Sequence, residues 1–235
     1  MLDSAYFRIW RPGPDPNYVT DRHFSPYLTE DCDGYAACEN RLRAILSKAE
    51  KSSAELDDCF PGVYSALKRA AFELQEYSGQ ILKASGLKTV RFVPPAHFAL
   101  LEEPMALSQY TCRARLLGED LTLTPFGQLT EGRLGEWYLE RAGVLPSFGS
   151  HPEATIRNLA AATAAVRCLL YAQFGPLSET ALSPSRKKGD GQGYFTSKSL
   201  FELTPPSWPK EEWYGFAFSP KHPVPLKPYP FRSSI

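Results

Sequence analysis

The chain has 235 residues, 43% of them hydrophobic, so it is long enough for one large domain or two small ones with a substantial core. Its 26 basic and 26 acidic residues balance, which argues against a uniformly basic polyanion binder and leaves room for a local basic groove. The N-terminus has no apolar core typical of a secretory signal, and no apolar run approaches the roughly 20 residues that a membrane span needs.

Residues 5–10 are expected to form a short aromatic strand, followed by a Pro-rich loop over 11–34. Residues 35–51 and 61–85 are expected to be helices, and the break at 57–60 lets them pair as a hairpin. The second helix has the clearer apolar stripe, formed by Val63, Leu67, Ala70, Leu74, Tyr77 and Ile81.

Residues 89–93 have strand composition and end at Pro94-Pro95. Apolar and polar residues alternate from 110 to 116, which is the period of a strand with one buried face. The turn residues 118–120 then lead into a second strand at 121–124, so the sequence predicts a hairpin.

Two further helices are expected, over 131–142 with Thr130 as its cap, and from Ser150 to Gly175. Strands are expected at 199–204 and 213–219 in the aromatic, Pro-rich C-terminal part. A chain that opens and closes with strands and has helices between them is typical of the α+β class.

Five cysteines are too widely spaced for a C-x-x-C zinc motif and are interpreted as reduced thiols of a cytoplasmic protein: Cys32, Cys38, Cys59, Cys112 and Cys168. The four histidines are not paired at ligand spacing, so no metal site and no cofactor are predicted.

A Gly-rich basic segment is the first candidate for phosphate binding. Arg186, Lys187 and Lys188 precede three glycines, whose backbone N–H groups can approach a phosphate, and Tyr194 could stack on a base. Lys198 follows as a further candidate cation. The alternative is a solvated connector between two elements, and no Walker pattern is present.

Arginines are the second candidate because they make planar, bidentate phosphate contacts. Arg113 and Arg115 share one strand face with no acid between them along the strand. Other candidate arginines, each of which could instead be a surface ion-pair partner, are Arg22, Arg41, Arg43 and Arg232. His23, beside Arg22 in a polar loop, is the candidate for proton transfer.

Both ends of the chain carry a family resemblance. At the N-terminal end the resemblance lies in Tyr6-Phe-Arg-Ile9 and Pro14-Asp15-Pro16, and at the C-terminal end in the runs 200–203, 214–216 and 224–226. These motifs resemble CRISPR-associated RNA-processing endoribonucleases, especially subtype I-F members. That family belongs to the RAMP superfamily, so the resemblance implies ferredoxin-like (RRM-like) strands in two halves. Residues 1–34 and 87–235 would form the RNA-binding body, and 35–86 an inserted helical finger similar to that of type IV members.

The resemblance implies metal-independent cleavage of CRISPR repeat RNA, in which a 2′-OH attacks the adjacent phosphate. It places Arg22, His23, Arg41 and Arg232 as candidate catalytic residues, with other subunits of an antiviral ribonucleoprotein complex as possible partners. One departure is that the helices expected at 131–142 and 152–173 are not basic, unlike the Arg-rich helix of I-F members. Two alternatives are a non-catalytic RNA-binding subunit and a protein-interaction module with an aromatic, Pro-rich tail.

Overall fold

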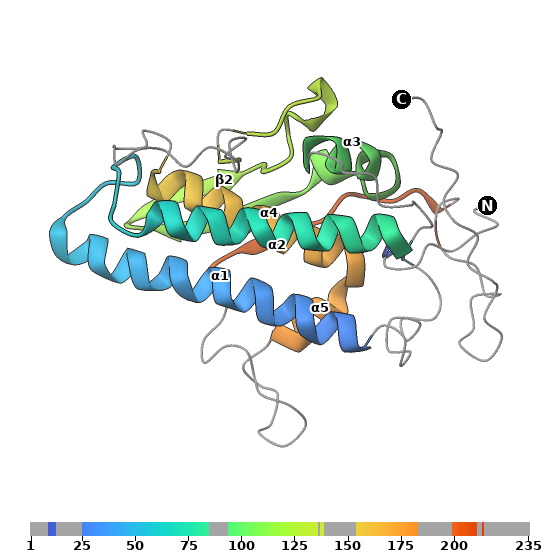
Figure 1. Ribbon diagram of the computed structural model, residues 1–235, viewed down its shortest axis with the longest axis horizontal. Coiled ribbons are helices and arrows are strands. Elements are labelled where there is room, and N and C mark those ends of the chain that lie inside the picture. The colour runs from blue at the N-terminus through green and yellow to red at the C-terminus, as the bar shows by residue number, and fades with distance from the viewer. Residues whose placement is uncertain are drawn as a thin grey trace, which may run out of the picture.

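The computed structural model describes residues 9–12, 25–84, 94–135, 137–138, 154–182, 199–210 and 213. Within these residues the chain is α+β, with five α-helices and one three-stranded antiparallel sheet (Figure 1). The helices are α1 (Ser25–Ser52), α2 (Val63–Ala84), α3 (Pro94–Met105), α4 (Ile156–Phe174) and α5 (Pro176–Leu182), and the strands are β1 (Thr111–Leu116), β2 (Glu119–Leu123) and β3 (Glu202–Thr204).

Helices α1 and α2 form the expected hairpin. The helix predicted at 61–85 is confirmed as α2, whose apolar stripe from Val63 to Ile81 is buried. The prediction of a loop over 11–34 is wrong for residues 25–34, which are already in α1. Their polar composition is typical of a loop, but the Tyr77 hydroxyl donates to the Asp31 carbonyl oxygen at 2.5 Å and ties this first part of α1 to α2.

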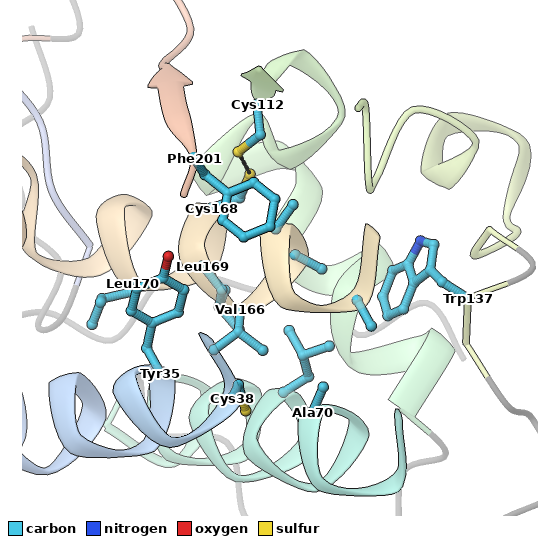
Figure 2. Close-up of a cluster of buried hydrophobic side chains, with 14 of the residues drawn as sticks. Tyr35, Cys38, Ala70, Cys112, Trp137, Val166, Cys168, Leu169, Leu170 and Phe201 are labelled. Carbon is cyan, nitrogen blue, oxygen red and sulfur yellow. Dashed lines mark hydrogen bonds between the residues drawn. The ribbon is translucent and has the colours of Figure 1, made fainter. Parts of the chain in front are cut away.

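Helix α4 is the centre of the core. Of its 19 residues 16 are buried, and it packs against α1, α2, α5 and β1. Figure 2 shows its side chains between Ala70 of α2 and Cys112 of β1. Thr155 caps the helix by accepting a hydrogen bond from the Asn158 N–H at 3.1 Å, and Ala154 is not helical, so the predicted start at Ser150 is too early.

The division into a body and an inserted finger at 35–86 stays a prediction. Both helices of that segment share one hydrophobic core with α4. The figure of the whole chain shows α1 and α2 running alongside each other over much of their length (Figure 1).

The predicted hairpin is confirmed, in a sheet with the order β2-β1-β3, but its second strand begins at Glu119 and ends at Leu123, so the predicted turn at 118–120 is placed too late. Its turn is formed by Leu117 and Gly118, with φ of 49° and 86°, as a two-residue turn of the mirror-image type requires. The strand predicted at 199–204 is confirmed only from Glu202 to Thr204, which pairs antiparallel with β1. The ferredoxin-like arrangement stays a prediction.

Helix α3 was not expected; it begins at Pro94-Pro95, because proline is accepted in the first turn of a helix. Two other expectations are wrong. The helix expected at 131–142 is absent from 132–135 and 137–138, because a short 3₁₀ turn ends at Gly132 with φ of 74°. Ile9 and Trp10 are not in a strand, although the Trp10 N–H donates to the Ala172 carbonyl oxygen at 2.9 Å.

The strand expected at 89–93 lies outside the described residues, and of 213–219 only Trp213 is described, as a bend. Helix α5 was not expected. Among the helices of the described segments, none has the length and apolar character that crossing a membrane would require.

Candidate nucleic-acid interface

The exposed face of the sheet carries two of the predicted RNA-binding arginines. Alternation along β1 turns Cys112, Ala114 and Leu116 into the core and leaves Arg113 and Arg115 exposed. Two residues of a strand span about 7 Å, so both guanidinium groups stand on one surface at a spacing suited to neighbouring phosphates. β1 is the central strand, and the arginines therefore lie in the middle of the sheet.

Acidic residues of the flanking strands stand beside these arginines. Asp120 of β2 is opposite Arg115 in the register, and the Arg115 Nε lies 3.9 Å from its Oδ1. Glu202 of β3 is opposite Arg113. Arg113 and Arg115 are therefore each opposite an acidic residue of a neighbouring strand, which the sequence of β1 alone does not reveal.

The Arg115–Asp120 pair is weak. The two side chains are 73% and 81% exposed, and exposed pairs contribute about 0–1 kcal/mol. Within the described part of the chain, Arg113 forms no ion pair. Both guanidinium groups are thus open to an incoming anion at little cost.

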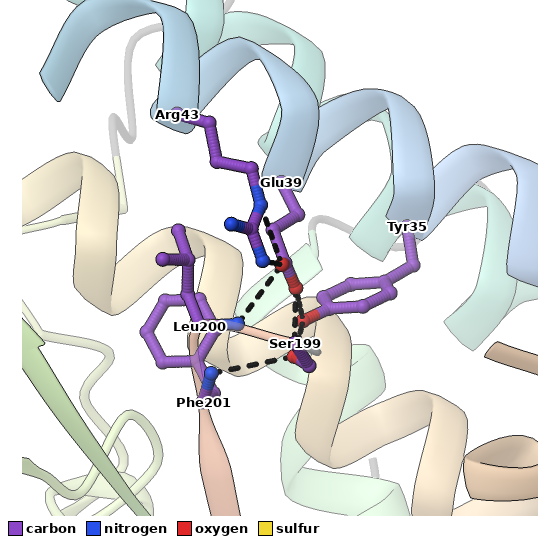
Figure 3. Close-up of polar contacts among 6 residues, drawn as sticks. All are labelled: Tyr35, Glu39, Arg43, Ser199, Leu200 and Phe201. Carbon is purple, nitrogen blue, oxygen red and sulfur yellow. Dashed lines mark hydrogen bonds and ion pairs between the residues drawn. The ribbon is translucent and has the colours of Figure 1, made fainter. Parts of the chain in front are cut away.

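Arg43 has a structural contact instead (Figure 3). Its Nε donates to Glu39 Oε1 at 3.0 Å, one helical turn away on α1. The fully buried Glu39 carboxylate also accepts from Ser199 Oγ at 2.8 Å and from the Leu200 N–H at 2.9 Å. The chain entering β3 is thereby fastened to α1, and Arg43 lies at this junction.

Tyr35 completes the Glu39 cluster, which we define as Tyr35, Glu39, Arg43, Ser199 and Leu200. The Tyr35 hydroxyl donates to Glu39. Burial raises the pKa of Tyr35 well above its ordinary value, although the charge of Arg167 acts in the opposite direction, so the hydroxyl stays a donor. Donors from four residues meet the Glu39 carboxylate, which satisfies this buried charge.

Arg41 is exposed, and its Nη2 donates to Ser65 Oγ at 2.9 Å, linking α1 to the start of α2. The structure therefore brings Arg113 and Arg115 together but does not bring Arg41 into a cluster with them. The other predicted site residues lie outside the described residues: Arg22, His23, Arg186, Lys187, Lys188, Tyr194, Lys198 and Arg232.

An acidic groove lies between α1 and α2. It has a volume of about 580 Å³, and four carboxylates line it, from Glu30, Asp33, Glu73 and Glu76, against one cation, Arg69. Burial raises the pKa of Glu73, although Arg69 opposes the shift. Because its excess charge is negative, this groove repels phosphates and is unsuited to RNA.

No group of three or more His, Cys, Asp or Glu side chains suited to a metal ion occurs in the segments that the structure describes. Burial lowers the pKa of His97, and its Nδ1 makes a hydrogen bond of 3.2 Å with Ser78 Oγ.

Sequence reasoning missed the Glu39 cluster and the buried Arg167. Glu39 and Arg43 are four residues apart on a helix, and this spacing predicts an ion pair. The sequence does not show that the Glu39 carboxylate is buried, because Ser199, which lies against it and donates a hydrogen bond to it, is 160 residues away. Arg167 lies over the Tyr35 ring at 5.3 Å and forms an ion pair with Glu179.

Comparisons with protein-family models, with curated proteins and with solved structures found no match to this chain.

Proposed function

We propose that this protein binds RNA through the exposed face of its sheet, with Arg113 and Arg115 contacting the phosphate backbone. The observation that carries the proposal is this pair of exposed arginines at the centre of an antiparallel sheet, with only weak competing contacts. A phosphate accepts two hydrogen bonds from one guanidinium group, which Asp120 at 3.9 Å does not do.

The charge distribution supports this choice of face. The groove between α1 and α2 has a clear excess of carboxylates, whereas the sheet face has two arginines against Asp120 and Glu202. An RNA backbone would displace Asp120 from Arg115 at a cost of at most about 1 kcal/mol. Binding is therefore expected to be modest and strongly dependent on salt.

The test is the affinity of a fluorescently labelled repeat-hairpin RNA, measured by anisotropy over a series of salt concentrations. Replacing Arg113 and Arg115 together by Ala should weaken binding and reduce the salt slope by about 0.7–0.9 per lost phosphate contact. The matched control replaces Lys48 and Lys51, two exposed cations of α1, by Ala. Equal effects of the two double variants would reject the sheet face as the binding surface.

The cleavage part of the proposal depends on the resemblance at the two ends of the chain. In this part of the proposal the protein has ferredoxin-like strands and is a cytoplasmic endoribonuclease that processes CRISPR repeat RNA by 2′-OH attack. Its candidate catalytic residues are Arg22, His23, Arg41 and Arg232. Such a reaction needs positioning, a base and charge stabilisation, and it requires no metal.

The cleavage part is tested on the same RNA, incubated with the protein in EDTA. The expected products carry a 2′,3′-cyclic phosphate and a 5′-OH, and a 2′-deoxy substitution at the cut position should abolish them. RNA that is bound with the predicted salt dependence but stays intact would contradict cleavage and leave a non-catalytic RNA-binding subunit. Intact RNA without binding would contradict both parts.

A further inference from the structure

Two buried thiols meet in the core. Cys112 Sγ of β1 and Cys168 Sγ of α4 are 3.6 Å apart, and both residues are fully buried (Figure 2). They are 56 positions apart in the chain, and their contact joins the central strand of the sheet to the central helix. A sulfur–sulfur bond is about 2.05 Å long, so the two sulfur atoms must approach each other further for a disulfide to form.

We propose that Cys112 and Cys168 are a redox modification site that forms a disulfide when the protein meets a peroxide. One thiol loses its proton, and its sulfur attacks a peroxide oxygen; the O–O bond breaks, a sulfenic acid forms, and the leaving hydroxide takes up the proton as water. The other thiol then loses its proton and its sulfur attacks the sulfenic acid sulfur; the S–S bond forms, the S–O bond breaks, and the leaving hydroxide takes up that proton as a second water. Two thiols are oxidised and hydrogen peroxide is reduced to two waters, so atoms and electrons balance.

Access to the sulfurs depends on the segment that enters β3. Phe201 is 4% exposed and belongs to the same hydrophobic core as Cys112 and Cys168 (Figure 2). The neighbouring Ser199 and Leu200 are the residues that Glu39 holds, at 2.8 and 2.9 Å. We expect that weakening these hydrogen bonds lets the segment around Phe201 open more often and gives peroxide access to the thiols.

This control of access sets the expected rate. Burial raises the pKa of Cys168 well above its ordinary value, and the neighbouring Cys112 raises it further, so little thiolate forms while the segment is closed. Oxidation of the native protein should therefore be slow, and it should accelerate when the Glu39 cluster is weakened.

The experiment treats the full chain with hydrogen peroxide, alkylates the remaining thiols in denaturant and maps the peptides by mass spectrometry. We expect one disulfide, between the peptides that contain Cys112 and Cys168. Cys38→Ser is the matched control because Cys38 is another buried thiol of the same core, and it should leave this disulfide unchanged. Ser199→Ala should form it several-fold faster.

The oxidised protein should also melt about 10 °C higher, because the bond closes a long loop of the unfolded chain. Cys112 and Cys168 recovered as separately alkylated or sulfonic acid species would overturn the proposal. A disulfide that forms at the same rate in wild type and Ser199→Ala would overturn the role of the Glu39 cluster in access.

Discussion

Replacement of Glu39 by Ala is expected to be one of the most destabilising single changes in the described part of the chain. The substitution removes the acceptor that the Tyr35 hydroxyl, the Ser199 hydroxyl and the Leu200 N–H share, and it leaves only the contact of 3.0 Å between Tyr35 and Ser199 to join Ser199 to α1. A buried donor that loses its partner costs about 1–3 kcal/mol. Arg43 is 28% exposed and can turn to water, so the whole loss should be about 3–5 kcal/mol.

Urea denaturation followed by circular dichroism measures this loss as a change in the free energy of unfolding. Glu50→Ala is the control, since Glu50 is an exposed glutamate of the same helix, and it should cost less than about 0.5 kcal/mol. In a double-mutant cycle, Glu39→Ala and Ser199→Ala should be coupled by about 1 kcal/mol. If Glu39→Ala costs less than about 1 kcal/mol, the Glu39 cluster does not hold β3 as described.

Two further predictions concern the packing of α2 against α1 and against α3. Gly34→Ala should destabilise the protein by about 1–3 kcal/mol, because a Cβ there would collide with Tyr77 and Glu73. Gly79→Ala should stabilise it by up to about 1 kcal/mol, because no atom lies within 4 Å of a Cβ there. Changes of the same sign in the free energy of unfolding for the two variants would refute this packing. Burial lowers the pKa of His97 below its ordinary 6.5, so the unfolded chain binds a proton that the folded chain resists. The melting temperature should thus fall as the pH drops below that value, and this dependence should be weaker in His97→Asn.

The helical hairpin and the β-hairpin were predictable from local signals. The apolar stripe of 61–85 and the alternation from 110 to 116 each lie in one short segment, and the structure confirms both. The start of α1 was not predictable from local signals, because residues such as Asp31 and Gly34 are typical of loops. In the structure they are helical and lie against Tyr77 and Glu73 of α2. Here tertiary packing overrides local propensity.

The candidate site shows the same division. Strand periodicity placed Arg113 and Arg115 on one exposed face, as the structure bears out. Their acidic neighbours Asp120 and Glu202 come from other strands, so only the sheet register reveals them. The contact between Cys112 and Cys168 likewise depends on a strand and a helix meeting in the core, for which the spacing of the cysteines gave no signal.

The most direct test of RNA binding by the sheet face is arginine footprinting. The protein is treated with an arginine-specific dicarbonyl reagent, with and without the repeat-hairpin RNA, and modification is measured peptide by peptide. Arg115 and Arg133 are 73% and 68% exposed, so both should react in the free protein. RNA is expected to protect Arg113 and Arg115 and to leave Arg133 reactive. Protection of Arg133 with undiminished modification of Arg113 and Arg115 would contradict RNA binding by the sheet face.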